Sequence, residues 1–171
     1  MPEAKVIRCC LNLAMNHNHS MRMRGAAHFE KTYEISEVAE LPKLQRILVL
    51  EDDVALAIML KQVLQEQNYL VTVVSNGAEG LKQVMANDFD VIVCDMIMPN
   101  FPGDLFYLAV ARSRPDLSKR FIFMTGHSGD RKIEQFIRRI RGLILWKPFD
   151  IHVLFDAIKV INSKRSDRPG N

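Results

Sequence analysis

From Arg46 onward, short apolar runs rich in β-branched residues alternate with segments of helical periodicity. The apolar runs cover residues 46–51, 70–74, 90–95, 121–125 and 143–147, and helical patterns follow at about 53–67, 76–87, 104–113, 129–141 and 149–162. Runs that are apolar on both faces are typical of parallel strands covered by helices on both sides. The alternation therefore predicts an α/β fold, a doubly wound (βα)5 domain with a five-stranded parallel sheet, over residues 44–162.

The segments on either side of this domain have a different pattern. We expect residues 1–43 to form a flexible N-terminal extension, with a short amphipathic helix at 29–41 as the one structured alternative. Residues 163–171 are expected to form a disordered tail. Residues 44–161 hold equal numbers of basic and acidic side chains, so the net charge of +3 comes from the two ends. This charge gives little reason to expect a nucleic acid as partner.

Hydropathy and cysteine content indicate where in the cell we expect the protein. No stretch approaches the roughly 20 consecutive apolar residues that a membrane-spanning helix needs, so we expect no membrane partner. Arg8 and Asn12 interrupt any signal-peptide core. The three cysteines include no Cys-x-x-Cys pair and cannot build a disulfide framework, which favours a cytoplasmic location.

Polar side chains stand where four of the five predicted strands end. In chain order they are Glu51, Asp52, Asp53, Asp95, Thr125 and Lys147. Ligands of an open parallel sheet bind outside the carboxyl ends of its strands, so we expect these side chains to converge at one edge. Crowded carboxylates repel one another unless a cation compensates them. An oxygen-only cluster beside a lysine suits Mg²⁺, and a carboxylate beside Mg²⁺ can act as a nucleophile that forms an aspartyl phosphate.

Four motifs, in this order, give the chain a specific resemblance. They are Ile47–Asp53 (ILVLEDD), Val91–Pro99 (VIVCDMIMP), Phe121–Gly126 (FIFMTG) and Lys147–Phe149 (KPF). Over about residues 44–162 the chain resembles the receiver domain of two-component response regulators, of the chemotaxis-regulator type. The resemblance implies a flavodoxin-like sheet with strand order 2-1-3-4-5.

The resemblance also implies roles for individual residues. Asp95 would be the phospho-acceptor, and Glu51 and Asp52 would bind Mg²⁺ together with Asp95 and the backbone carbonyl of Ile97. Asp53 would cap the following helix, although an alignment shifted by one residue makes it a metal ligand instead. The resemblance further implies that Thr125 and Lys147 contact the phosphoryl group and that the Lys147–Pro148 peptide bond is cis.

The function implied by the resemblance is signal transmission, not enzymatic turnover of a substrate. A sensor histidine kinase or a histidine phosphotransfer protein would donate the phosphoryl group to Asp95, with Mg²⁺ as cofactor. Because few residues follow position 162, we expect a stand-alone receiver whose output passes through contacts with another, unknown protein.

The chain departs from the family pattern at three positions. Ile144 stands where an aromatic switch residue is common, and we expect it to form an apolar output surface with Trp146, with a buried Trp146 as the alternative. Ile97 and His127 occupy positions that influence the rate of dephosphorylation in that family, although His127 could instead be a plain loop residue. The apolar Ile97 cannot position an attacking water, which predicts a long-lived phosphoryl group.

The basic segment 131–141 is predicted to be a solvated helix face in preference to a docking surface.

Three other classes of protein fit the sequence less well. Haloacid-dehalogenase-type phosphatases also use Asp, Mg²⁺, Thr and Lys, but their nucleophile follows the first strand, whereas Asp95 follows the third. Nucleotide-binding enzymes of similar topology need a glycine-rich phosphate loop, and residues 77–80 (GAEG) do not form one. A docking module that is never phosphorylated would leave the polar strand ends unexplained.

Overall fold

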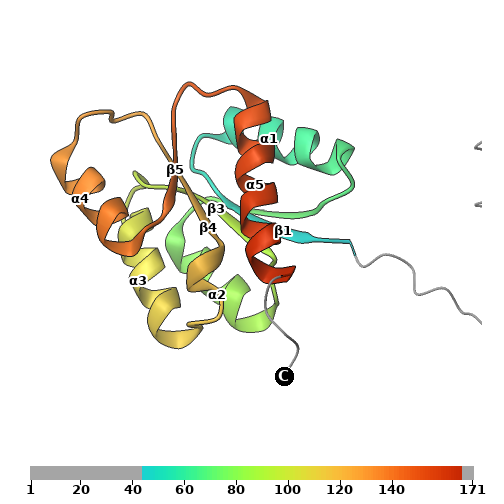
Figure 1. Cartoon of the computed structure of the whole chain (residues 1–171), viewed down its shortest axis with the longest axis horizontal. Coiled ribbons are helices and arrows are strands. Elements are labelled where there is room, and N and C mark those ends of the chain that lie inside the picture. The colour runs from blue at the N-terminus through green and yellow to red at the C-terminus, as the bar shows by residue number, and fades with distance from the viewer. Residues whose placement is uncertain (1–43, 167–171) are drawn as a thin grey trace, which may run out of the picture. The chain divides into compact units, whose positions relative to one another are not determined.

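The computed structural model describes residues 44–166 (Figure 1). The predicted N-terminal extension over 1–43, with its alternative helix at 29–41, lies outside the described residues, as does the chain beyond Ser166. Within the described part, strands and helices alternate in the predicted order. No helix of residues 44–166 is long and apolar enough to cross a membrane.

The observed elements follow the predicted ones closely. The strands are β1 (Arg46–Leu50), β2 (Leu70–Val74), β3 (Val91–Asp95), β4 (Phe121–Thr125) and β5 (Leu143–Trp146). The helices are α1 (Val54–Glu66), α2 (Gly77–Ala86), α3 (Gly103–Ser113), α4 (Arg131–Ile140) and α5 (Ile151–Ser166), with a short 3-10 helix η1 (Ser118–Arg120) before β4. Helix α5 continues past residue 162, so the start of the predicted disordered tail, at 163–166, is helical and that part of the prediction was wrong.

All five strands are parallel and lie in the order β2-β1-β3-β4-β5, as the resemblance implied. Leu50 at the end of β1 lies opposite Cys94 of β3, and Thr125 at the end of β4 lies opposite Trp146 of β5. The carboxyl ends of neighbouring strands therefore meet at one edge of the sheet, and this edge carries the polar residues of the strand ends.

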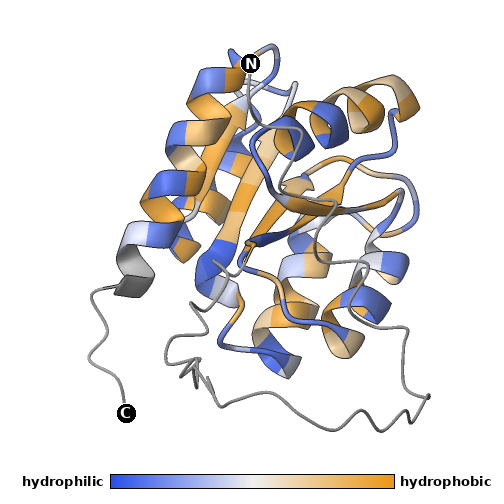
Figure 2. Cartoon of the chain, turned by 90° about the vertical axis from the view of Figure 1, so that its right-hand side faces the viewer, coloured by the Kyte–Doolittle hydropathy of each residue, from blue (hydrophilic) through white to orange (hydrophobic). Residues whose placement is uncertain are grey.

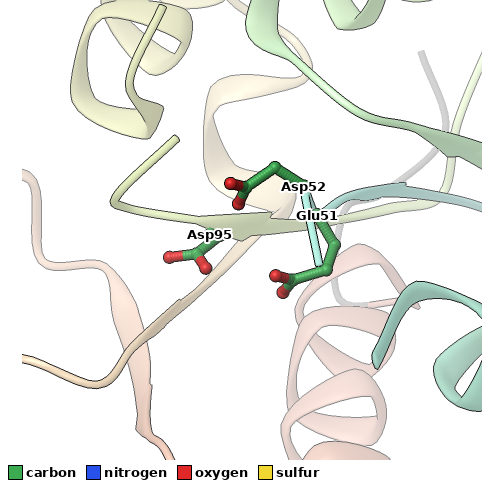
Figure 3. Close-up of side chains that lie close together, drawn as sticks. All are labelled: Glu51, Asp52 and Asp95. Carbon is green, nitrogen blue, oxygen red and sulfur yellow. The ribbon is translucent and has the colours of Figure 1, made fainter. Parts of the chain in front are cut away.

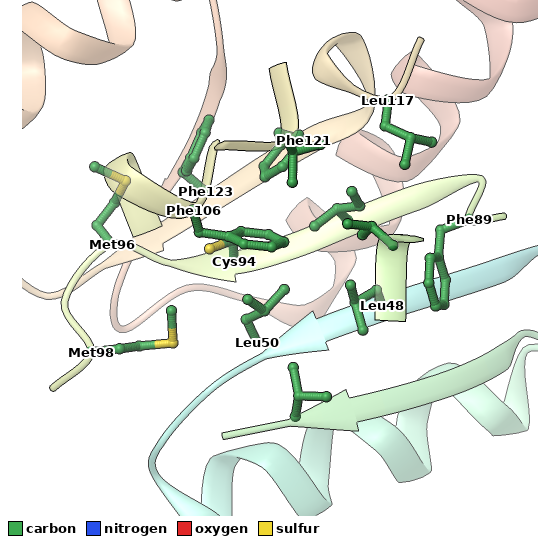
Figure 4. Close-up of a cluster of buried hydrophobic side chains, with 14 of the residues drawn as sticks. Leu48, Leu50, Phe89, Cys94, Met96, Met98, Phe106, Leu117, Phe121 and Phe123 are labelled. Atoms are coloured by element: carbon green, nitrogen blue, oxygen red, sulfur yellow. The ribbon is translucent and has the colours of Figure 1, made fainter. Parts of the chain in front are cut away.

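Two apolar layers cover the sheet, one on each face. Helices α2, α3 and α4 pack on one face through side chains such as Val84, Phe106 and Phe136. Helices α1 and α5 cover the other face through side chains such as Leu60 and Leu154. Figure 4 shows part of the first layer, and Figure 2 shows apolar strands beneath helices whose outer surfaces carry hydrophilic residues. Burial of both faces is what the apolar runs predicted.

Side-chain caps determine where three helices begin. The Asp53 carboxylate accepts a hydrogen bond of 3.0 Å from the Leu56 amide at the start of α1. Asn76 and Asp130 cap α2 and α4 in the same manner. Each cap satisfies an amide that the first helical turn leaves without an intrahelical partner. The cap at Asp53 also fixes the direction in which the chain leaves β1, directly after Glu51 and Asp52.

Candidate functional site

Three carboxylates from the ends of β1 and β3 lie close together. One carboxylate oxygen each of Glu51, Asp52 and Asp95 falls within 4.8 Å of the other two (Figure 3). Glu51 and Asp95 are almost fully buried, with 2% and 7% of their surface exposed, whereas Asp52 is exposed. The cluster therefore opens to solvent on the side of Asp52.

Lys147 reaches this cluster from the loop after β5. Its Nζ donates to Oε2 of Glu51 at 2.7 Å and to Oδ2 of Asp95 at 2.5 Å. The Lys147 amide donates to the Thr125 carbonyl at 2.7 Å, which holds the residue after β5 against the end of β4. The peptide bond between Lys147 and Pro148 is cis, as the resemblance implied.

Burial and pairing act in opposite directions on these charges. Burial raises the pKa of Glu51 above its usual value, and the hydrogen bond from Lys147 only partly offsets this effect. Burial disfavours the ammonium of Lys147, but its hydrogen bonds to Asp95 and Glu51 outweigh that cost and raise the pKa of Lys147. Lys147 is therefore a fixed positive charge near neutral pH.

The polar groups around Asp95 are held by backbone contacts. The amide of Ile97 donates to Oδ1 of Asp95 at 2.9 Å, which leaves Oδ2 to face Lys147. Thr125 is completely buried at the end of β4, and its hydroxyl oxygen accepts a hydrogen bond of 3.2 Å from the His127 amide. A hydroxyl that accepts from a backbone amide still has its own proton to donate to a ligand oxygen.

The remaining residues singled out from the sequence have distinct environments. The Asp53 carboxylate caps α1 and is not part of the acidic cluster, which agrees with the capping role expected for it. Cys94, next to Asp95, is fully buried in the apolar layer, and burial raises the pKa of its thiol well above the usual value. Such a thiol packs as a small apolar group and is not a reactive nucleophile.

The side chains at the end of β5 divide between surface and core. Trp146 is 36% exposed and belongs to neither buried cluster, so the alternative of a buried Trp146 was wrong. Ile144 is partly buried and packs against the layer under α4. Helix α4 buries Ile133, Phe136 and Ile137 and exposes most of its basic side chains, as predicted for a solvated face.

The donor set of the cluster fits a hard divalent cation. All of its ligand atoms are carboxylate oxygens, which Mg²⁺ prefers, and no thiol or imidazole competes among them. Three carboxylates beside one lysine crowd acidic oxygens in a partly buried place, and a divalent cation would offset their repulsion. With such a cation bound, Asp95 would have both a cation and an ammonium beside it.

One feature of the site has no counterpart in the sequence prediction, namely the ion pair between Lys147 and Glu51. The spacing of the motifs places both residues at the same edge but does not state which carboxylates the lysine contacts. The sequence offers one signal for this contact. The apolar run before Glu51 places the backbone of this residue in the buried part of the sheet edge. A buried glutamate needs a cationic partner, and Lys147 is the cation that pairs with Glu51.

Comparisons with known proteins agree with this geometry. Residues 47–159 match the family described as response regulator receiver domain. The response regulator ArlR of Staphylococcus haemolyticus is 30% identical over 125 residues, which cover 69% of this chain and 52% of ArlR. The sensor kinase CckA of Brucella abortus is 24% identical over 137 residues, which cover 79% of this chain and 14% of CckA. The chain thus spans about half of one relative and a small part of the other.

Solved structures show the same fold. A CheY-like response regulator receiver domain protein from Methanospirillum hungatei superposes with a TM-score of 0.67 at 24% identity, over 73% of this chain and 99% of that one. The response regulator protein TrrA from Thermotoga maritima, solved in complex with Mg²⁺ and BeF, has a TM-score of 0.62 at 25% identity. That similarity covers 69% of this chain and 99% of TrrA.

Proposed function

This chain belongs to the response regulator receiver domain family, and on that premise we propose that Asp95 accepts a phosphoryl group from a histidine. The donor would be a sensor histidine kinase or a histidine phosphotransfer protein. The observation that carries the proposal is the pair of contacts at Asp95, whose carboxylate lies in the acidic cluster and against the Lys147 ammonium.

The transfer step requires a carboxylate lone pair directed at phosphorus and a stabilised leaving group. A carboxylate oxygen of Asp95 attacks the phosphorus, the bond from phosphorus to the donor imidazole nitrogen breaks, and the imidazole leaves with the electron pair of that bond. Lys147 would hold negative charge on the phosphoryl oxygens as the bond forms. Thr125 would donate its hydroxyl proton to one of them.

The same site would hold Mg²⁺ as cofactor. Glu51, Asp52 and Asp95 would bind it with the backbone carbonyl of Ile97, and Asp53 would stay at the helix cap. When bound, Mg²⁺ supplies positive charge to the phosphoryl oxygens and lowers the repulsion between them and the carboxylates. TrrA, which has been solved with Mg²⁺ and BeF, supports this assignment by its similarity to the chain.

The proposed output is a change of surface and not a reaction on a further substrate. A phosphoryl group adds negative charge and acceptor oxygens beside Thr125, and it would bias the position of that residue and of Trp146 opposite it. Exposed Trp146 and partly buried Ile144 support an output surface along β5. The sequence further predicts a stand-alone receiver that acts through an output protein. It also predicts a cytoplasmic location and no nucleic acid as partner.

Incubation of the full chain with acetyl phosphate and Mg²⁺, followed by intact-mass measurement, tests the proposal. We expect the mass of one phosphoryl group to be added to the wild type and none to Asp95→Asn. Asp150→Asn is the matched control, because Asp150 lies near the same edge of the sheet and its carboxylate accepts from the His152 amide, a role that asparagine also fills. An unchanged wild-type mass, or a phosphorylated Asp95→Asn, would contradict it.

A further inference from the structure

We propose that a cavity of the domain, at the edge of the sheet opposite the acidic cluster, binds a small organic anion with an apolar body. The cavity has a volume of about 310 Å³ and lies between η1, α3, β4, α4, β5 and α5. It is lined by Phe121 and Leu143, the first residues of β4 and β5, whereas Asp95 and Thr125 stand at the ends of their strands. The proposal goes beyond phosphorylation and does not depend on it.

The inner part of the cavity is aromatic. Tyr107 of α3 packs edge-on against Phe121 and Phe123 of β4, with ring centroids 5.1 and 5.7 Å apart. All three rings line the cavity, together with aliphatic side chains of α4, β5 and α5. Phe121 and Phe123 are buried beneath this lining, and the apolar surface that a ligand can cover is that of Tyr107, Ile140 and Leu143, which are only partly buried. The rings behind Tyr107 hold it in place, so a ligand can bind without ordering the protein further.

Residue 142, between α4 and β5, is a glycine whose backbone packs closely against the lining. A Cβ atom at Gly142 would lie 3.1 Å from the Ile140 Cδ1 atom and 3.1 Å from the Phe123 Cε2 atom. These contacts are tighter than ordinary van der Waals distances, so any larger residue would have to push into the lining. The backbone at Gly142 thus forms a wall of the cavity.

The polar groups of the lining favour an anion. Lys119 and Arg141 both line the cavity, both are exposed, and neither forms an ion pair with any residue of the described part of the chain. Burial raises the pKa of Tyr107, whose hydroxyl therefore stays protonated and able to donate. The other hydroxyl, that of Ser118, already donates to the Pro115 carbonyl at 2.8 Å. The lining includes no acidic residue.

Size and charge together select the class of ligand. A volume of about 310 Å³ lies at the lower end of the range of small-molecule sites, so the cavity suits a compact molecule and not a folded partner. An apolar interior with two cations among its lining residues matches a ring or branched chain that carries one carboxylate, sulfonate or phosphate. A neutral molecule of the same shape would gain no charge-assisted hydrogen bond from either cation.

The test uses 8-anilinonaphthalene-1-sulfonate, an aromatic anion, as the probe for the full chain. We expect saturable one-to-one binding by fluorescence, and chemical-shift changes of the Tyr107, Gly142 and Leu143 amides in ¹H–¹⁵N spectra. The neutral analogue N-phenyl-1-naphthylamine should bind more weakly. Binding that shifts the amides of Val54 and Ile58 instead would overturn the proposal, because these exposed residues line a different cavity, beside α1. Absence of saturable binding would overturn it as well.

Charge variants test the role of the two cations. Lys119→Gln combined with Arg141→Asn should weaken probe binding by about tenfold, the usual effect of losing one or two hydrogen bonds between charged groups. Asparagine at position 141 tolerates the left-handed backbone conformation of Arg141, which has a φ of 53°. The control, Arg131→Gln with Lys132→Gln, removes two exposed charges from the other end of α4. Equal weakening in both double variants would refute a specific anion site.

Discussion

Lys147 Nζ lies 2.7 Å from Oε2 of Glu51, although 96 residues separate the two in the chain. The same nitrogen lies 2.5 Å from Oδ2 of Asp95. One ammonium thus holds the ends of β1 and β3 against the loop that follows β5. It compensates charge that burial would otherwise make unfavourable, and it does so at the place where a phosphoryl group would be bound.

Removal of this ammonium should destabilise the metal-free protein. We expect Lys147→Met to lower the free energy of unfolding by about 1–3 kcal/mol, because two buried carboxylates lose their common partner while Lys147 itself is partly in contact with water. Mg²⁺ should restore part of the loss by supplying positive charge. Urea denaturation with and without Mg²⁺ measures both effects. Lys132→Met, an exposed lysine on α4, is the control and should change stability by less than about 0.5 kcal/mol.

Neighbouring aspartates should differ in their effect on metal binding. Asp52→Asn should weaken Mg²⁺ binding at least about tenfold, because it removes a ligand oxygen of the cluster. Asp53→Asn should leave the affinity nearly unchanged, since asparagine also caps a helix and the Asp53 side chain is bonded to Leu56. Isothermal titration calorimetry of both variants shows which of the two aspartates is a metal ligand. A larger loss in Asp53→Asn would reverse the assignment of the two residues.

The phosphoryl group on Asp95 should be long-lived. The side chain of Ile97 is 43% exposed beside Asp95, and it has no polar atom that could orient an attacking water. We expect a half-life of minutes or longer, measured as the decay of phosphoprotein mass after acetyl phosphate is removed. Ile97→Asn should shorten it by about tenfold or more, whereas Leu105→Asn, an exposed apolar residue of α3, should not. A wild-type half-life of seconds would contradict this prediction.

Trp146 should report the change at the phosphorylated site. It is the one tryptophan of the chain, it is 36% exposed, and it pairs in register with Thr125. Addition of beryllofluoride with Mg²⁺ should therefore change its fluorescence emission, and Asp95→Asn should abolish the change. An emission spectrum that stays constant in the wild type would remove Trp146 from the switch.

Most of the fold could be predicted from the sequence because each element carries a strong local signal. Strands such as Val91–Asp95 are apolar at nearly every position, and Asp53, Asn76 and Asp130 mark helix starts. The end of α5 was predicted too early. Asn162 and Ser163 favour termini and turns, but tertiary packing of Ile158 and Ile161 holds the last turns in the helix.

The candidate site was predicted in outline and not in its contacts. Strand ends place Asp95, Thr125 and Lys147 at one edge, which the strand order confirms. Which oxygen faces the lysine depends on side-chain rotamers, and the hydrogen bond from the Ile97 amide to Asp95 sets one of them. The exposure of Trp146 depends on packing between elements far apart in the chain. Periodicity in a single strand does not encode either feature.

Chemical identification of the phosphorylated residue tests the central claim most directly. After treatment of the full chain with acetyl phosphate and Mg²⁺, reduction by borohydride converts an aspartyl phosphate to homoserine, which peptide mass spectrometry locates. The account predicts homoserine at position 95 alone, and only when Mg²⁺ is present. Homoserine at position 52 or 53, or formation at position 95 at an equal rate in the presence of a chelator, would contradict it.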